Sequence, residues 1–446
     1  MTRTAGIDWA SEVHEVCISE GEVVERFGVV HDETGIADLC AHLIELGVER
    51  IAIERPEGVL VERLLEAGLV VLAIHPNQLK AARARFAVAG GKSDRFDAFA
   101  LAELARTDSH RFRAIVPDSD ETKALRALTR AREDLVGVRV ELANQLRARL
   151  LAFWPGALVF ADVDSPISLA FIRRYPSPAE ACGLGVKRMQ GFLDRTGYSG
   201  RTSARVLVER MRSAPSGTAA ERESQARRAI VVGLVAALEP IVTQIRELTG
   251  EIRAALATHA DAPIFAALFR DPKTVICPAS LIAEIGDRRE RYPTEAALAA
   301  DAGMSPVAVE SGKLRVASFR RACDKRLRSA VVTLADSTRH WHPWAKDVYL
   351  RARDRGQDHP RAIRTLGRAW IRVLWRCWRS RVAYDPARHG NLSRLEGGSG
   401  AINHSRWIAT GAQSASQRVP HGVDRPNRAE PEPPGPDRPH VTMIRG

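Results

Sequence analysis

The stretches Ala5-Gly6-Ile7-Asp8 and Ile51-Ala52-Ile53-Glu54 decide the predicted fold, because each is a short apolar run that ends on an acid. Such runs are typical of buried strands. A third stretch, Lys92-Ser93-Asp94-Arg95-Phe96-Asp97, places two acids three residues apart at the predicted start of a helix, on one helix face. Carboxylates are the ligands that hard divalent cations prefer, and four of them can form a two-metal phosphodiester site.

The chain has a marked excess of positive charge. Its 446 residues include 66 Lys and Arg against 54 Asp and Glu, which gives a formal net charge of +12 and a pI near 9.8. This balance favours polyanionic partners and fast electrostatic encounter with them. An acidic cluster in a basic chain therefore indicates metal-dependent chemistry on nucleic acid, with two Mg²⁺ ions as the expected cofactor.

Composition argues against several other classes. The apolar content of 45% and charged content of 27% are typical of a soluble globular protein, and the length allows two or three domains. The six cysteines include no Cys-x-x-Cys pair, which argues against a disulfide framework or a zinc site. No run approaches the roughly 18 apolar residues that span a bilayer, and no signal peptide is visible. We therefore expect no membrane partner and a cytoplasmic location.

Residues 4–116 are predicted to form an α/β domain with a mixed sheet. Strands are expected at Ala5–Ile18 and Val23–Val30, with Gly21 at the turn of a leading hairpin. The elements predicted to follow are a helix at 34–46, a strand at 50–54, a helix at 59–67, a strand at 69–74, and helices at 76–88 and 94–106.

Residues 117–262 are predicted to contain two long helices, at 121–153 and 221–259, the second kinked near Pro240. Leu128, Leu135 and Leu142 recur every seven residues in the first helix, which is typical of a coiled-coil-like seam. We expect the two helices to pair. The seam is equally compatible with a helical hairpin core and with a dimer interface.

Residues 263–388 are predicted to be mostly helical and carry the densest positive charge. Arg364, Arg368, Arg372 and Arg376 recur every four residues and form a cationic ridge on one helix. No acid is interleaved to relieve their repulsion, so we expect the ridge to contact nucleic-acid phosphates; a solvated arginine face is the alternative. The Pro-rich segment 389–446 is predicted to be a disordered tail.

Each of the four acids also has an ordinary interpretation. Asp8 alone could be a turn or capping residue, and Glu54 alone a solvated surface group. Lys92 and Arg95 could pair with Asp94 and Asp97 as surface ions, worth about 0–1 kcal/mol. The spacing of the full set, on two strands and a helix, favours the metal site over these interpretations.

Several motifs resemble those of the DEDD transposases of the insertion-sequence-110 family, in an order that covers most of residues 4–386. They are Gly6–Ala10, Glu54–Gly58, His75–Asn77, Lys92–Ala98, Leu125–Arg130, Ala283–Asp287, Ala302–Pro306, Glu310–Lys313 and Trp370–Trp378. Two features depart from the family pattern. Arg270–Thr274 lacks the glycines of a Pro-Gly-x-Gly turn, so close phosphate approach at Pro272 is not expected, and the residues after His389 differ from the family's usual ending.

The resemblance implies a RuvC-like, RNase H-type fold for residues 4–116, metal binding by Asp8, Glu54, Asp94 and Asp97, and a nucleophilic role for Ser311. The implied reaction cleaves and rejoins double-stranded DNA at element ends and targets, through a covalent phosphoserine. The resemblance also implies a homo-oligomer, either a dimer or a tetramer, and a structured guide RNA, the bridge RNA. A bacterial cytoplasm is the implied location, at the nucleoid when the protein is bound to DNA.

The sequence leaves two other functions open. A hydrolytic nuclease, such as a RuvC-like junction resolvase, could use the same acids without Ser311, because Ser311-Gly312 taken alone is a turn signal. An inactive copy could bind nucleic acid through the arginine ridge alone. Lys313, in the same motif as Ser311, is expected to contact nucleic acid together with the ridge.

Overall fold

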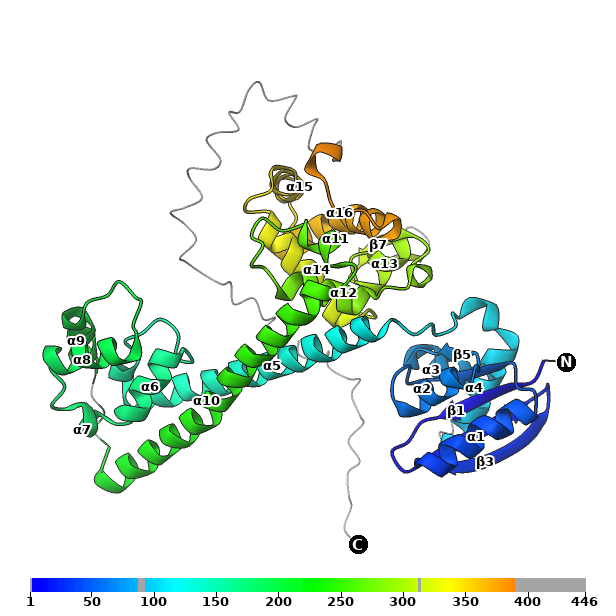
Figure 1. Cartoon of the computed structure of the whole chain (residues 1–446), viewed down its shortest axis with the longest axis horizontal. Helices are drawn as coiled ribbons and strands as arrows, with labels where there is room; N and C mark the ends of the chain where they lie inside the picture. The colour runs from blue at the N-terminus through cyan, green and yellow to red at the C-terminus, as the bar shows by residue number, and fades with distance from the viewer. Residues whose placement is uncertain (1, 87–92, 216, 218, 312–313, 390–446) are drawn as a thin grey trace, which may run out of the picture. The chain divides into compact units, whose positions relative to one another are not determined.

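A five-stranded mixed sheet organises the N-terminal part of the protein in the computed structural model, which describes residues 2–86, 93–215, 217, 219–311 and 314–389. The strand order is β3-β2-β1-β4-β5 (Figure 1). The first three strands pair antiparallel, and β4 pairs parallel with β1 and β5. The strands are β1 (Thr4–Asp8), β2 (Val13–Ser19), β3 (Val23–Val30), β4 (Arg50–Ile53) and β5 (Val71–Ala73). The predicted mixed α/β sheet is confirmed.

The prediction of a single strand over Ala5–Ile18 is wrong, because the chain reverses direction after β1. Asp8 pairs with Glu15 in the antiparallel ladder, so residues 9–12 form the connection. Neither Gly nor Pro marks this turn in the sequence. Instead the buried His14 ring accepts a hydrogen bond from the Ala10 N–H at Nδ1, over 3.2 Å. Nε2 therefore carries the ring proton and donates to Nδ1 of His31 at 2.8 Å.

Helices cover both faces of the sheet. Ile51 and Ile53 join a core with α1 (Glu33–Glu45) and α2 (Val59–Glu66), whereas the intervening Ala52 joins a core with α3 (Pro76–Phe86) and α4 (Asp94–Thr107). This alternation is the expected period of a strand that is buried on both sides. All four helices lie close to their predicted positions; the predicted end of the third lies outside the described residues.

The backbone of α4 lies directly against β1 at Gly6. A Cβ atom at Gly6 would come within 2.0 Å of the Ala98 carbonyl oxygen and 2.3 Å of the Ala102 amide nitrogen. The Thr4 hydroxyl also donates to the Ala102 carbonyl at 2.9 Å. Because no side chain separates the two backbones, the position of α4 is fixed relative to the strand that carries Asp8.

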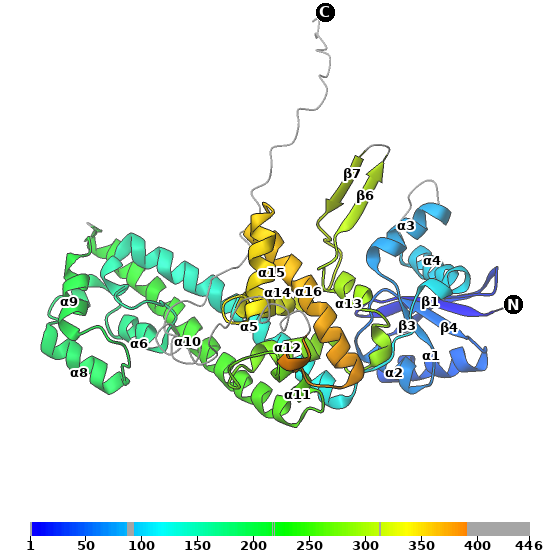
Figure 2. The ribbon, with the colours of Figure 1, turned by 90° about the horizontal axis from the view of Figure 1, so that it is seen from above.

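Two long helices, α5 (Asp120–Phe153) and α10 (Glu221–Thr258), lie side by side (Figures 1 and 2), which confirms their predicted pairing. The heptad residues Leu128, Leu135 and Leu142 are half-buried. The fully buried leucines of α5 are Leu125, Leu146 and Leu150. The most buried positions of α5 are thus offset from the heptad read in the sequence, because a straight helix with 3.6 residues per turn drifts away from a seven-residue repeat.

Among the described residues, α10 is long and apolar enough to cross a membrane by length and composition alone, with a mean hydropathy of 1.6 over 18 residues. It packs instead against α5 and α6 (Pro166–Arg174), and 22% of that apolar window is buried. Ile230 and Val232 of α10 remain exposed, as does Val138 of α5. The helix pair therefore presents apolar side chains to solvent.

Further helices lie between α5 and α10 and after α10. Those between them share a core around Phe171 and Phe192 and are α6, α7 (Pro178–Ala181), α8 (Val186–Thr196) and α9 (Ala204–Ser213). The later ones are α11 (Ala262–Ala266), α12 (Ile276–Ile285), α13 (Glu295–Asp301), α14 (Lys325–Thr338), α15 (Pro343–Asp354) and α16 (His359–Ser380). Residues 386–446 form a separate unit, described as far as the short 3₁₀ helix Pro386–Arg388 and His389. The predicted disordered tail otherwise lies outside the described residues.

A two-stranded hairpin interrupts the helices that follow α10, where the sequence indicated mostly helix (Figure 2). β6 (Val307–Ser311) pairs antiparallel with β7 (Leu314–Ser318), and these strands form a sheet of their own. Every residue of β6 is exposed. Its Val309 faces Val316 across the hairpin, and both side chains are in solvent.

We predict that Gly6→Ala destabilises the protein by about 1–3 kcal/mol or more, because the new methyl group must push α4 off β1. Urea unfolding measures the change. Gly137→Ala on α5 is the matched control: its Cβ meets nothing within 4 Å, and removal of a helical glycine stabilises by roughly 0.5–1 kcal/mol. A Gly6→Ala protein as stable as the wild type would contradict the backbone contact.

We also predict that the contribution of His14 to the free energy of unfolding falls with pH below about 6.5, opposite in sign to the contribution of Asp8, whose pKa is raised. Burial and the neighbouring His31 lower the pKa of His14 to about 4, whereas an unfolded histidine titrates near 6.5. The unfolded chain therefore takes up the proton first, and stability is lost between about pH 6.5 and 4, by up to about 3 kcal/mol. His14→Gln should flatten this part of the urea-unfolding profile, and His110→Gln, on an exposed residue, should leave it unchanged.

Candidate functional site

The sheet places Asp8 and Glu54 next to each other. Asp8 is the last residue of β1, and Glu54 directly follows β4. The two strands are parallel neighbours, and Ile7 pairs with Ile53, so the acids come one position later on adjacent strands. Both side chains are half-buried. The carboxyl ends of parallel strands meet at one edge of a sheet, and these two acids share that edge.

The first turn of α4 supplies the other two acids. Ser93 caps the helix by accepting a hydrogen bond from the Phe96 N–H at 3.2 Å. Asp94 and Asp97 follow in the first turn, where the helix dipole favours negative charge. Asp97 is buried, with 2% of its surface exposed, and Asp94 is exposed.

Electrostatics show that the structure brings all four predicted acids together. Burial and, in decreasing order, the negative charges of Asp97, Asp94 and Glu54 together raise the pKa of Asp8 to about 6. Arg83 acts in the opposite direction. A carboxyl group whose pKa is raised by three other carboxylates lies in a site of concentrated negative charge.

Arg83, on α3, neutralises part of this charge and was missed by the sequence reasoning. Its guanidinium binds both carboxylate oxygens of Asp97, with Nη2 at 2.5 Å from Oδ2. Arg95 pairs with Glu15 at 3.6 Å, not with Asp94 or Asp97 as the ordinary interpretation supposed; Lys92 lies outside the described residues. Nothing in the sequence distinguishes Arg83 from the other arginines of its helix.

The donor set fits a divalent cation, but its present arrangement does not form a closed site. Among the described residues, no group of three or more His, Cys, Asp or Glu is placed to hold a metal ion. Carboxylate oxygens are the ligands that Mg²⁺ prefers, and the repulsion that raises the pKa of Asp8 is what a cation would relieve. Arg83 binds both oxygens of Asp97 and therefore competes there with a bound cation.

Ser311 lies at the end of β6 and is exposed. Within the described part of the chain, no hydrogen bond links its hydroxyl to the four acids. Gly312 and Lys313, which follow it, lie outside the described residues, so the expected nucleic-acid contact of Lys313 has no structural account. The sequence indicated a turn at Ser311, and the strand does end there.

The arginine ridge lies on α16 as predicted, but its members differ in surroundings. Arg372 and Arg376 are exposed. Arg368 is half-buried and donates to the Glu295 carbonyl at 3.0 Å, and burial lowers its pKa. Arg364 stacks over the Phe319 ring at 4.8 Å. The exposed half of the ridge is therefore the part placed to meet an outside partner.

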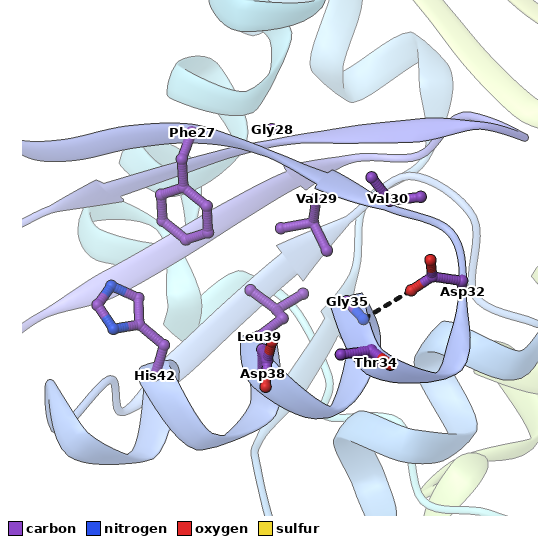
Figure 3. A pocket seen from close by; sticks show the side chains of 10 residues that line it. All are labelled: Phe27, Gly28, Val29, Val30, Asp32, Thr34, Gly35, Asp38, Leu39 and His42. Atoms are coloured by element: carbon purple, nitrogen blue, oxygen red, sulfur yellow. Dashed lines mark hydrogen bonds between the residues drawn. The ribbon is translucent and has the colours of Figure 1, made fainter.

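A groove of about 530 Å³ lies between β3 and α1 (Figure 3). Its lining includes Phe27, Leu39 and His42, and none of the predicted site residues. Asp32 at its rim caps α1 by accepting the Gly35 N–H at 2.7 Å. The sequence reasoning did not identify this groove.

Two family models match the chain. One, of DEDD transposases of the IS110 type, matches residues 5–155, which include the four acids. The other describes transposases of the IS116/IS110/IS902 family and matches residues 275–350, which include Ser311.

Curated proteins resemble nearly the whole chain. The mini-circle transposase assigned to IS117 of Streptomyces coelicolor is 30% identical over 404 residues, which is 87% of this chain and 96% of that protein. A 44.8 kDa protein of insertion element IS116 from Streptomyces clavuligerus is 27% identical over 86% of this chain and 94% of its own length. Among solved structures, T. thermophilus RuvC in complex with a Holliday junction substrate aligns with 26% of this chain and 100% of that chain, at 18% identity and a TM-score of 0.21.

We predict that Arg83→Gln lowers the free energy of unfolding by about 3 kcal/mol in EDTA, because it leaves the buried Asp97 carboxylate without its partner. Arg85→Gln is the matched control on the same helix: its side chain is 58% exposed and pairs with Asp108, so its loss should cost less than about 1 kcal/mol. Urea unfolding compares the two. Equal small losses would show that the Arg83–Asp97 pair does not hold the site together.

Proposed function

Because the chain belongs to the IS110 family of transposases, we propose that it cleaves and rejoins DNA strands with its four acids as divalent-metal ligands and Ser311 as nucleophile. The observation that carries the proposal is the packing of α4 on β1 at Gly6, which gathers the acids at one sheet edge. An RNase H-type, RuvC-like domain over residues 4–116 is part of the proposal, and the observed mixed sheet supports it.

Bound Mg²⁺ would polarise the phosphodiester and stabilise the leaving oxygen. The proposed ligands of the metal come from three elements. Asp8 and Glu54 present carboxylates from adjacent strands, and α4 presents Asp94 and Asp97 from its first turn. Arg83 would move from Asp97 when the site is loaded. Until then it holds the carboxylate in place.

The proposed cleavage forms a bond between Ser311 Oγ and phosphorus and breaks one phosphorus–oxygen bond of the DNA backbone. The serine proton leaves to a base, and the departing strand end takes up a proton as a free hydroxyl. Attack by the hydroxyl of another strand then forms a new phosphodiester and regenerates the serine. No phosphodiester bond is lost overall, as recombination requires. The exposed position of Ser311 leaves it accessible to a DNA strand.

We propose that the reaction takes place in a homo-oligomer, a dimer or tetramer, in which the acids of one copy meet Ser311 of another. Exposed apolar side chains on the long helices, Val138 and Ile230 among them, support an interface between copies there. The proposed regions are residues 4–116 with the acids, 117–262 with the long helices, 263–388 with Ser311, and the tail 389–446.

The proposed nucleic-acid partners are double-stranded DNA at element ends and targets and a structured guide RNA. The net charge of +12 supports polyanionic partners in general. Arg372 and Arg376 are exposed and are the members of the ridge proposed to contact phosphates. The cytoplasm, at the nucleoid when the protein is bound to DNA, is the proposed location.

The test combines purified protein, Mg²⁺, RNA transcribed from the element flanks and a supercoiled plasmid that carries the element ends. Wild type should give recombinants and a protein–DNA adduct that survives detergent. Ser311→Ala should lose both by at least about 1000-fold, since removal of a nucleophile abolishes the covalent step. Ser318→Ala is the matched control, because Ser318 is an exposed serine on the partner strand of the same hairpin.

Two results would contradict the proposal. Recombination by Ser311→Ala at the wild-type rate would remove the serine from the mechanism. Cleavage without any adduct in the wild type would favour a hydrolytic nuclease instead. Asp8→Asn should abolish cleavage while DNA binding remains, and full activity of Asp8→Asn would exclude Asp8 as a metal ligand.

A further inference from the structure

Two residues next to the proposed metal ligands stack on each other. Trp9 follows Asp8, and Arg55 follows Glu54. Because Ile7 and Ile53 pair on adjacent parallel strands, the chain leaves both strands side by side. The Arg55 guanidinium lies over the Trp9 ring, 4.1 Å from its centroid. This is a cation–π contact at short range, and it directly follows the strand ends that carry Asp8 and Glu54. Trp9 packs on the sheet face that α1 and α2 cover, whereas α4 lies on the other face.

The Trp9 ring is held in place by packing contacts. It packs against the core that the sheet forms with α1 and α2. Its centroid lies 6.2 Å from the rings of both His14 and His31, and His14 is fully buried and holds the turn after β1 through Ala10. A fixed indole limits the motion of the guanidinium above it, so Arg55 loses little further side-chain entropy when it binds a ligand.

Arg55 differs from the other arginines around the acids. Arg83 binds Asp97 and Arg95 pairs with Glu15. Arg55 is exposed, and across the described residues its guanidinium has the Trp9 stack but no hydrogen bond or salt bridge within the chain. A planar guanidinium that is held by its face keeps its edge donors available to an outside acceptor.

We propose that Arg55 binds a backbone phosphate of the DNA strand that enters the acidic site, and that Trp9 positions it for this contact. The inference rests on the proposed function, in which that strand is cut at the acids. Four carboxylates repel a phosphodiester, and a fixed positive charge beside them offsets the repulsion during approach. The guanidinium fork matches two phosphate oxygens, a geometry that a lysine ammonium does not reproduce.

Fluorescence anisotropy with a fluorescein-labelled DNA duplex of arbitrary sequence, about 30 base pairs long, tests the proposal in EDTA across a salt series. Arg55→Gln should weaken binding about three- to tenfold at low salt. It should also reduce the slope of log K against log salt by about 0.9, the value for one lost phosphate contact. Arg26→Gln is the matched control: Arg26 is exposed and also lies over an aromatic ring, Phe99 at 5.4 Å, but on β3, two strands from β1. It should leave both quantities unchanged.

Two further variants separate a phosphate contact from a merely structural role. Arg55→Lys should restore the salt slope but only part of the affinity, because the charge returns without the fork. Trp9→Phe should keep the slope and lose less affinity than Arg55→Gln. An unchanged affinity and slope in Arg55→Gln, an equal loss in Arg26→Gln, or a loss confined to an RNA hairpin probe would each overturn the proposal.

The assay contains no divalent metal and involves no strand cleavage. Its result therefore stands even if Asp8→Asn proves fully active and the acids are not the site of cleavage. Conversely, an inactive Asp8→Asn together with an unaffected Arg55→Gln would reject the phosphate contact and leave the proposed function in place.

Discussion

The contact between the backbones of α4 and β1 at Gly6 is the constraint on which the acidic site depends. β1 carries Asp8 at its end, and α4 carries Asp94 and Asp97 in its first turn. A side chain at position 6 would occupy the space now held by the Ala98 carbonyl. The residue with no side chain thus brings helix and strand close enough for their acids to interact, although it contributes no chemical group of its own.

Bringing the acids together is energetically unfavourable, and Arg83 offsets part of this cost. A buried carboxylate is costly unless it is paired, and Asp97 is buried at 2% exposure. Arg83 satisfies it with two hydrogen bonds, while Asp8 keeps a raised pKa. The site is therefore stabilised for folding in a form that differs from the form proposed for reaction. Buried charge pairs of this kind cost much to break from one side.

Much of the N-terminal fold could be predicted because the local signals there are strong. Gly47 and Gly68 follow two helices and adopt positive φ, which marks helix ends in sequence as in structure. The turn after Asp8 could not be predicted, since it depends on a histidine ring that binds a backbone amide four residues earlier. Such side-chain contacts carry no periodic signal.

Some residues of the candidate site could likewise be predicted from the sequence, and others could not. The four acids could be found from strand ends and helix spacing, because those patterns are local. Arg83 and Arg55 could not, since their roles follow from tertiary contacts with Asp97 and Trp9. The β6–β7 hairpin was missed because it is a short insertion between helices; its valines are exposed, and its strands have no further sheet to join.

The exposed hairpin has a consequence for the timing of the proposed chemistry. Two strands without further partners are marginally ordered in water, and β6 carries Ser311 at its end with every residue exposed. A hydroxyl in bulk solvent has no base to activate it and is inert toward phosphodiesters. In the proposed mechanism, Ser311 of an isolated copy is therefore not activated. Strand cleavage in this mechanism waits until assembly on the substrate brings Ser311 and the acids together.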